Sequence, residues 1–330
     1  MTHKTPPTDR PARIAVLDDY MGVAHRLADW SVLEGRATVD FLTSALPSGR
    51  EAETLKDYDA ICLLRERMDV PGELLRQLPD LRAIVSTGRR NRTLDDATAQ
   101  EMGIPIMTTS GSGNGVYATV ELAWGLILSL MRHIPAESDA MRAGAWQTRM
   151  GNAIYGRTLG LVGLGRLGSR MAENARSFGM NVIAWSPNLT HERAAEAGAE
   201  HVDKETLFRT ADVVSLHLVL AETTRGIVGA DDLGRMKPEA ILVNTSRGPL
   251  VDEAALLDAL RHKRIRAAGI DVFEPEPLPA DHPLRALPNA LLTPHLGYAV
   301  EETLAAFYAE IVENLDGWLN GTPPRLLHPA

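Results

Sequence analysis

Cysteine and positive charge are both scarce in this chain of 330 residues. The chain has a single cysteine, Cys62, which excludes a disulfide within the chain. Cys62 lies in an apolar run, residues 60–64, so we interpret it as a small buried hydrophobe and not as a catalytic thiol. Lys and Arg number 34 against 43 Asp and Glu, which gives a formal net charge of -9. This balance argues against a surface that follows nucleic acid or an anionic membrane, so any anionic ligand must meet a local positive site.

The sequence also lacks a segment typical of secretion or membrane insertion. Residues 1–12 are polar, contain three prolines and have no apolar core of about seven residues, so they match neither a signal peptide nor an anchor. We expect this segment to be a disordered lead-in. The most hydrophobic long stretch, residues 116–131, contains Glu121 and falls short of the about 20 apolar residues that a span requires. It predicts a buried helix, and we expect the protein to be cytoplasmic.

From Arg13 onward, short apolar runs alternate with amphipathic stretches of helical period. With 45% hydrophobic and 23% charged residues, the chain is long enough for about two domains. The regular alternation of strand and helix predicts an α/β fold, in which a parallel sheet carries helices on both faces. The strands expected in the first domain are residues 14–17, 38–42, 60–64, 81–86 and 104–107.

A second doubly wound sheet is expected after the most glycine-rich stretch of the chain, residues 110–115, where we place a hinge. A long helix, residues 117–132, follows the hinge. The last helical pattern, residues 301–319, has no strand left to pair with, so we expect it to cross back onto the first domain. The assigned domains are residues 1–112 with 300–330, and residues 113–299. The strands expected in the second are residues 158–162, 181–185, 213–218, 240–244, 267–272 and 290–293.

One glycine motif has the setting of a nucleotide-binding fold. Residues 163–168 read Gly-Leu-Gly-Arg-Leu-Gly, which matches G-x-G-x-x-G. An apolar strand leads into the motif, a helical pattern follows it and a second strand completes a βαβ unit. Its glycines permit a tight turn, the approach of a pyrophosphate and close packing of helix on strand, while the helix N-terminus supplies amide donors and partial positive charge. The residues expected to hold the dinucleotide here are Gly163, Gly165, Arg166, Leu167 and Gly168.

The residue in the position that would hold the adenosine ribose is neutral. About 18 residues past the last glycine, at the end of the second strand, such folds carry an acidic residue for the ribose hydroxyls. Ser186 stands there in this chain. Without a carboxylate to repel it, a 2′-phosphate can be accommodated, so we favour NADP. In the alternative interpretation, Ser186 begins an ordinary turn and NAD is used. Residues close enough in sequence to serve the phosphate are Asn188, Thr190, His191 and Arg193.

Three polar segments follow predicted strands of the second sheet. They are residues 244–248 (Asn-Thr-Ser-Arg-Gly), 271–277 (Asp-Val-Phe-Glu-Pro-Glu-Pro) and 293–297 (Thr-Pro-His-Leu-Gly). Ligands of open α/β sheets bind at the carboxyl ends of the strands. Each segment alone has an ordinary structural explanation, but together they place a cation, an acid and a titratable base downstream of a nucleotide fold.

Taken in order, these motifs resemble the D-isomer-specific 2-hydroxyacid dehydrogenase family. The resemblance covers residues 13–320 and includes the glycine motif, residues 236–253 and the last two polar segments. It implies a flavodoxin-like substrate domain, a Rossmann NAD(P)-binding domain and the interconversion of a 2-keto acid and a D-2-hydroxy acid. The family's catalytic Arg, Glu and His are matched by Arg247, Glu276 and His295.

The chemistry gives each matched residue a reason. Reduction of a 2-keto acid needs a hydride from the nicotinamide C4 and a proton for the carbonyl oxygen. A charged imidazole at His295 can donate that proton, and an ionised Glu276 beside it would favour the charged ring and hold its tautomer. The guanidinium of Arg247 can hold the substrate carboxylate and polarise the carbonyl. By the same resemblance Asp271 matches an acidic residue beside the nicotinamide. The further cofactor contacts expected are Asn188, Leu218, Thr245 and Gly297.

The resemblance assigns the rest of the substrate site to the first domain. Family members bind the substrate carboxylate with backbone amides of the loop after the fourth strand, here residues 87–92 (Thr-Gly-Arg-Arg-Asn-Arg), which include Gly88. Arg90 stands where the family usually has a second glycine. Arg89 or Arg90 would meet a distal anionic group of the substrate; on the alternative interpretation the loop is a solvated basic segment or makes interdomain ion pairs. Arg65, at the end of the third strand, is a further candidate.

Several functional alternatives stay open. Glyoxylate or hydroxypyruvate reduction is the leading assignment, with 3-phosphoglycerate dehydrogenase activity as the alternative; formate dehydrogenases carry glutamine in the place of Glu276, which argues against that activity. An NAD(H)-sensing corepressor of the same fold would retain the three matched residues, so the sequence does not separate it from an enzyme. No clustered His or Cys spacing indicates a metal site. The resemblance implies a homodimer formed through the cofactor domain and the helix at residues 116–132, with no nucleic acid or membrane partner.

Overall fold

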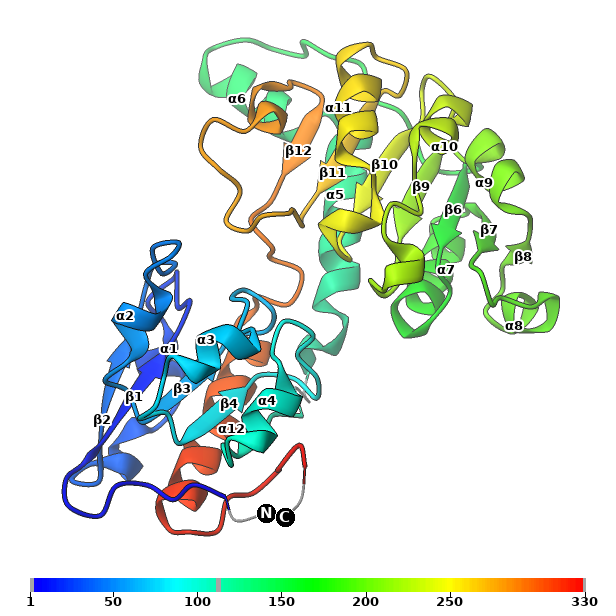
Figure 1. Ribbon diagram of the computed structural model, residues 1–330. Coiled ribbons are helices and arrows are strands. Elements are labelled where there is room, and N and C mark those ends of the chain that lie inside the picture. Colours follow the sequence, from blue (N-terminus) through cyan, green and yellow to red (C-terminus); the bar gives the residue numbers. More distant parts are fainter. Residues whose placement is uncertain (1–2, 111–113, 329–330) are drawn as a thin grey trace. The chain divides into compact units, whose positions relative to one another are not determined.

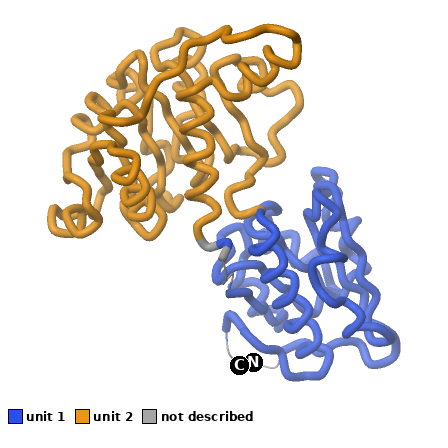
Figure 2. The backbone as a smooth tube through the Cα atoms, turned by 180° about the vertical axis from the view of Figure 1, so that it is seen from behind, with its two compact units in different colours: residues 1–116, 300–330 blue, residues 117–299 orange. Residues whose placement is uncertain are grey.

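Two separate parallel sheets organise the chain, as a computed structural model shows for residues 3–110 and 114–328 (Figure 1). Unit 1 comprises residues 1–116 and 300–330, and unit 2 comprises residues 117–299 (Figure 2). The boundary between them falls at residue 116 and not at the expected residue 112. Of the expected hinge, residues 111–113 lie outside the described part of the chain.

Unit 1 is built on a five-stranded sheet in the order β2-β1-β3-β4-β5, with every pairing parallel. This is the flavodoxin-like order, and the fold class expected from the alternation of strand and helix is confirmed. The strands are β1 (Ala12–Val16), β2 (Ala37–Phe41), β3 (Ala60–Leu63), β4 (Ala83–Ser86) and β5 (Ile106–Thr108). The helices are α1 (Ala24–Leu27), η1 (Trp30–Leu33), α2 (Glu51–Leu55), α3 (Gly72–Arg76), α4 (Asp96–Glu101), η2 (Asn114–Tyr117) and α12 (Glu301–Leu319).

Helices cover both faces of this sheet because its central strands are apolar on both sides. All four residues of β3 and of β4 are buried. On one face, Ile61 and Ile84 pack with Leu75 of α3 in a shared core. The other face is covered by α12, which contacts β4, β5, α1 and η1 and buries Tyr308 and Trp318. The last helix therefore completes the unit that the first 116 residues begin. Cys62 of β3 is fully buried, as expected of a small core hydrophobe.

Unit 2 is built on a seven-stranded parallel sheet in the order β12-β11-β10-β9-β6-β7-β8. From β6 the chain adds β7 and β8 on one side, and then β9 to β12 on the other side. The strand order therefore reverses between β6 and β9, which is the switch point of a dinucleotide-binding fold. The strands are β6 (Thr158–Val162), β7 (Asn181–Trp185), β8 (Glu200–His201), β9 (Val213–Leu216), β10 (Ile241–Asn244), β11 (Ala267–Ile270) and β12 (Ala290–Leu292). The helices are α5 (Ala118–Arg132), α6 (Ile134–Arg142), α7 (Arg166–Ser177), α8 (His191–Glu196), α9 (Lys204–Thr210), η3 (Glu222–Thr224), α10 (Ala230–Arg235), η4 (Gly248–Leu250), α11 (Glu253–Arg261) and η5 (Pro283–Ala286).

Alternate residues of each central strand of this sheet enter two different cores. In β10, Ile241 and Val243 pack with residues of α5 and α7, whereas Leu242 packs with residues of α9, α10 and α11. Side chains of a strand alternate between the two faces, so a strand that is apolar at every position requires a helical layer on each face. Among the described residues, no helix is long and apolar enough to cross a membrane. The apolar stretch before residue 132 is instead the buried helix α5.

Residues 3–11 are not the disordered lead-in that their composition suggested. The Lys4 amide donates to the Gly103 carbonyl (2.7 Å) and its ammonium donates to the Leu81 carbonyl (2.9 Å). Arg82 also donates to the carbonyl of Thr5 (3.2 Å). The expectation was wrong because it considered only apolar content, whereas polar contacts hold this segment.

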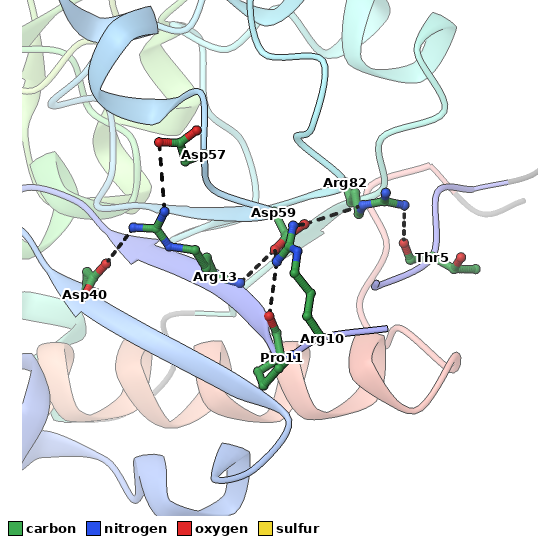
Figure 3. A network of polar contacts seen from close by, with 8 residues as sticks. All are labelled: Thr5, Arg10, Pro11, Arg13, Asp40, Asp57, Asp59 and Arg82. Atoms are coloured by element: carbon green, nitrogen blue, oxygen red, sulfur yellow. Dashed lines mark hydrogen bonds and ion pairs between the residues drawn. The ribbon is translucent and has the colours of Figure 1, made fainter. Parts of the chain in front are cut away.

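The strongest of these polar contacts converge on Asp59, whose side chain is completely buried just before β3 (Figure 3). Its two oxygens accept hydrogen bonds from Arg10 Nη1 (2.7 Å) and Nη2 (2.9 Å), and Oδ2 also accepts from the amide of Arg13 (2.8 Å). Arg82 Nε lies 3.6 Å from Oδ1. A carboxylate without solvent is tolerated only when its lone pairs are used in this way, so Asp59 fixes the start of β1.

We expect Asp59→Asn to lower the free energy of unfolding by about 2–3 kcal/mol, because the amide keeps the size of the side chain but removes the buried charge to which Arg10 and the Arg13 amide donate. Urea denaturation measures the change. The control is Glu53→Gln, which removes the exposed Arg50–Glu53 pair (2.9 Å) and should leave the stability almost unchanged, because solvent screens such a pair. Equal stabilities of the two variants would contradict the assigned role of Asp59.

Candidate active site

The glycine motif forms the turn between β6 and α7, and two of its glycines are required sterically. Gly163 has φ +102°, and a Cβ there would lie 2.7 Å from the main-chain carbonyl of His217. A Cβ on Gly168 would lie 2.2 Å from the carbonyl oxygen of Gly163. The turn can therefore close only because side chains are absent at both positions.

The remaining glycine of the motif, Gly165, is not required by packing. Gly165 is exposed at the N-cap of α7, and a Cβ there would meet no atom of the protein within 4 Å. The space in front of it lies at the amino end of a twelve-residue helix whose first amides point outward. Arg166 is exposed and Leu167 half-buried on the first turn of the same helix. This open cradle fits the pyrophosphate of a dinucleotide. Leu218 lies at the first glycine of the turn, where its amide nitrogen would be 3.0 Å from a Cβ on Gly163.

The end of β7 borders a cavity of about 640 Å³. Ser186 lies on its wall, and the neutral residue expected at the ribose position is therefore next to open space. Thr190 caps α8 by accepting a hydrogen bond from the Arg193 amide, and the Arg193 side chain donates to the carbonyl of Asn188 (3.3 Å). The residues that line the cavity are Trp185, Ser186, Pro187, Leu189, His191, His201, Val202, Asp203 and Thr206.

Arg247 lies in the tight loop between β10 and η4. Asn244 fixes this loop, since its side chain donates to the Arg247 carbonyl (2.8 Å) and accepts from the Ser246 amide (3.0 Å). A Cβ on Gly248 would lie 2.6 Å from the main-chain carbon of Phe273. The glycine after Arg247 therefore allows this loop to touch the loop that carries Glu276.

Asp271 follows β11 and is completely buried. Its carboxylate accepts hydrogen bonds from the Thr293 hydroxyl (2.6 Å) and from the amides of Leu296 (2.7 Å) and Gly297 (2.9 Å). Burial raises the pKa of Asp271, while these hydrogen bonds and the charge of His295 act in the opposite direction. Asp271 therefore holds the turn of residues 293–297 from inside and is not itself exposed for contact with a ligand.

The turn held by Asp271 presents His295 to Glu276. His295 has a left-handed backbone (φ +54°), and its amide donates to the Asp271 carbonyl (2.8 Å). Its Nδ1 lies 2.6 Å from Glu276 Oε2, and the other oxygen of Glu276 accepts from the Phe273 amide (2.8 Å). Their side chains are 15% and 20% exposed, so the pair is shielded but reachable.

Glu276 stays ionised at neutral pH in this setting. Burial acts to raise the pKa of its carboxyl, but the hydrogen bond and charge of His295, the Phe273 amide and the charge of Arg247 outweigh burial and lower it. A carboxylate on Nδ1 leaves Nε2 as the other nitrogen of the ring for a reacting group. The three residues expected to act together are thus gathered on one unit.

The expected substrate loop belongs to unit 1 and departs from expectation at Gly88. Gly88 is buried at φ +84°, and its amide donates to the Thr109 hydroxyl (2.8 Å), so this N–H is already used inside the protein. A Cβ on Gly88 would lie 1.8 Å from Arg65 Nη1, so the Arg65 guanidinium lies directly on the loop. Arg89 and Arg90 are exposed, and within residues 3–110 and 114–328 neither makes a hydrogen bond or ion pair.

Four structural supports of the site were not found from the sequence. Asn244, Thr293 and Gly248 lie in or beside the polar segments, so their proximity was visible but their contacts were not. Thr119, on α5, donates to the carbonyl of Gly297 (2.8 Å), and nothing in its local sequence indicates this contact.

Thr245, expected to contact the cofactor, is buried directly after β10. No group of three or more His, Cys, Asp or Glu residues in the described chain could hold a metal ion.

Comparison with known proteins decides the family. The family described as D-isomer specific 2-hydroxyacid dehydrogenase, NAD binding domain, matches residues 124–297. The chain belongs to the D-isomer specific 2-hydroxyacid dehydrogenase family. It is thus an oxidoreductase with an NAD-binding domain, and the family resemblance noted in the sequence is confirmed.

Relatives of this dehydrogenase are named for several activities. It is 38% identical over 293 residues to a glyoxylate reductase from Aeropyrum pernix, which covers 86% of this chain and 85% of the relative. It is 36% identical over 272 residues to a D-3-phosphoglycerate dehydrogenase from Methanocaldococcus jannaschii, which covers 82% of this chain but 51% of the relative. A crystal structure titled as a putative D-3-phosphoglycerate dehydrogenase from Ralstonia solanacearum matches with a TM-score of 0.87 at 35% identity, covering 97% of this chain and 99% of that one.

The glycine turn of this dehydrogenase gives a matched pair of variants. We expect Gly165→Ala to leave the thermal unfolding midpoint unchanged, because its Cβ meets no protein atom, and to weaken NADH binding at least about tenfold, because it occupies the cradle. Gly168→Ala should lose stability as well, by about 1–3 kcal/mol, because its Cβ collides with the Gly163 carbonyl. Nucleotide fluorescence titration measures the affinity, and undiminished NADH binding by Gly165→Ala would remove the cradle from the cofactor site.

Proposed function

We propose that this dehydrogenase interconverts a 2-keto acid and a D-2-hydroxy acid, with His295 as acid and base, Glu276 as its partner and Arg247 as the group that holds the substrate carboxylate. The observation that carries the proposal is the 2.6 Å contact between His295 Nδ1 and Glu276 Oε2. A nicotinamide cofactor, when bound, supplies or accepts the hydride at the carbonyl carbon.

The protein's own residues handle the proton and the charge. Glu276, ionised beside Nδ1, favours the charged imidazole, and His295 then gives its Nε2 proton to the carbonyl oxygen during reduction. In oxidation the same nitrogen takes the proton back. The fixed guanidinium of Arg247 orients the substrate carboxylate and stabilises negative charge on the carbonyl oxygen. Asp271 positions His295, because its carboxylate holds the turn of residues 293–297.

The substrate class is a small 2-keto acid, with glyoxylate or hydroxypyruvate as the first candidates. Relatives named glyoxylate reductase, which this chain covers for most of their length, support this choice. Relatives named D-3-phosphoglycerate dehydrogenase support 3-phosphohydroxypyruvate as the alternative. Arg89 and Arg90, which are exposed, would meet a distal anionic group if the substrate carries one. The amides of this loop beyond Gly88 would hold the substrate carboxylate, with Arg65 as a further candidate.

A spectrophotometric panel tests the substrate assignment. Glyoxylate, hydroxypyruvate, pyruvate, phenylpyruvate and 3-phosphohydroxypyruvate are each run with NADH and with NADPH. Turnover of 2-keto acids at ordinary enzyme rates supports the proposal, and absence of turnover across the panel contradicts it. If Arg89 and Arg90 meet a distal anion, the double variant Arg89→Ala/Arg90→Ala loses kcat/KM for the phosphorylated substrate and keeps it for glyoxylate.

For the cofactor we favour NADP over NAD because Ser186 is neutral. If Ser186 only begins a turn, NAD is used instead, and the ratio of Michaelis constants for NADPH and NADH separates the two. A clear preference for NADH would overturn this choice.

We expect His295→Ala to lose at least about a hundredfold in kcat, the usual contribution of a general acid. The control is His282→Ala, which removes a similar histidine–carboxylate pair (His282 to Glu253, 3.1 Å) elsewhere on unit 2 and should keep kcat. Glu276→Gln should lose more activity in reduction at about pH 8 than at about pH 6, because the amide no longer favours the charged imidazole. Steady-state kinetics across pH measures both, and near-unchanged kcat in His295→Ala would contradict the acid–base role.

We also propose that the chain forms a homodimer through unit 2. The long helix expected to form the interface buries seven of its side chains within its own chain. Large exposed hydrophobic residues instead gather in the segment that follows it. They are Ile134, Met141, Trp146, Met150 and Tyr155, each at least 51% exposed. An apolar surface of this kind favours contact with a second copy of the chain.

Trp146→Asp is expected to convert a dimer into a species near the chain mass of 35.9 kDa, because it places a charge in the apolar contact. Val32→Asp, at an exposed hydrophobic residue of unit 1, is the control and should leave the mass of the particle unchanged. Sedimentation equilibrium measures both. A wild-type chain that sediments only as a monomer would contradict the dimer.

A further inference from the structure

A pair of histidines stands on the wall of the cavity beside Ser186. His191 begins α8 and His201 ends β8, and their rings meet edge to face with centroids 4.4 Å apart and planes at 81°. His201 Nδ1 lies 3.4 Å from His191 Nε2. The register of the sheet causes this meeting, because β8 pairs with β7 so that His201 lies opposite Ala184, two residues before Ser186.

The pair has hydrogen-bonding capacity that the protein does not use. The contact between the rings occupies His201 Nδ1 and His191 Nε2. The outer nitrogens, His201 Nε2 and His191 Nδ1, make no hydrogen bond within the described part of the chain. Two neutral imidazoles carry two N–H groups, one of which lies between the rings, so one outer nitrogen is a donor and the other an acceptor. A pair that has gained one proton presents two outward donors and one positive charge.

Two carboxylates lie near the histidine pair. Asp203 lines the same cavity, with its carboxylate held by the amide (2.7 Å) and hydroxyl (2.9 Å) of Thr206. Glu192 on α8 interacts electrostatically with both histidines. Both carboxylates oppose a bare anion in the cavity.

Two cations lie near the cavity, but neither is part of its lining. Lys204 lies over the Trp185 ring (5.5 Å) and donates to Asp232 (2.8 Å). Arg193 donates to the carbonyl of Asn188 (3.3 Å). The positive charge on the wall of the cavity itself is therefore that of a protonated histidine pair.

We propose that His191 and His201 form the recognition site for the 2′-phosphate of NADP, and that the pair takes up a proton when it binds that phosphate. The inference rests on the proposed dinucleotide site and adds to it the residues that select the cofactor. Ser186 supplies a hydroxyl and no repelling charge, while the two outward N–H groups donate charge-assisted hydrogen bonds to the phosphate oxygens. Histidine changes charge between about pH 5 and pH 8, so cofactor selection becomes dependent on pH.

Binding of the reduced cofactors to the full chain tests the proposal without turnover. NADPH and NADH dissociation constants are measured by nucleotide fluorescence at about pH 6 and about pH 8. We expect NADPH to bind at least about tenfold more tightly than NADH at the lower pH, and this advantage to shrink at the higher pH. In His201→Asn and in His191→Gln the advantage should fall to about twofold or less at both pH values, with the NADH dissociation constant unchanged.

His262→Gln is the matched control, because His262 is an exposed histidine of unit 2 paired with Asp258 (2.8 Å) on α11. It should retain the wild-type preference and its dependence on pH. A wild-type chain that binds NADH as tightly as NADPH at the lower pH, or histidine variants that keep the wild-type preference, would overturn the proposal. Failure of the wild-type chain to bind either cofactor would instead contradict the dinucleotide site on which it rests.

Discussion

The edge of unit 2 that carries His295 and Glu276 depends on one carboxylate that has no access to water. Asp271 is completely buried, so its charge requires donors from the protein, and the turn at residues 293–297 supplies three of them. Satisfying Asp271 fixes the path of that turn and holds His295 in a left-handed backbone that a free loop would seldom adopt. The position of His295 beside Glu276 therefore depends on the hydrogen bonds that the buried carboxylate of Asp271 requires.

Close approach of main chains imposes the second constraint. Gly163 and Gly168 allow the turn after β6 to fold onto its neighbours, and Gly248 allows the Arg247 loop to touch the main chain of Phe273. Gly165 differs from these, because the protein leaves open space in front of it. The same residue type thus serves packing at three positions and access at the fourth, and only the surroundings of each glycine distinguish them.

Local charge and not net charge governs the polar sites of this acidic chain. Arg247 and the His295–Glu276 pair lie on one unit, where the charges of His295 and Arg247 lower the pKa of Glu276, and the exposed Arg89 and Arg90 lie on the other. In the cavity beside Ser186, the carboxylate of Asp203 and the histidine pair line the same wall. The formal net charge of -9 therefore does not indicate the charge of the ligand that any one site binds.

The sequence by itself determined the two parallel sheets, the glycine turn and the three polar strand-end segments, because hydrophobic period, turn glycines and strand ends are local properties of the chain. It did not reveal β8, whose two residues are too few to show a period, or the contacts that hold residues 3–11. Only the tertiary structure decided that the Gly88 amide is used by Thr109, 21 residues away, and that His201 meets His191. Such pairings depend on strand register and on which buried group needs a partner, and both are settled only when distant segments pack.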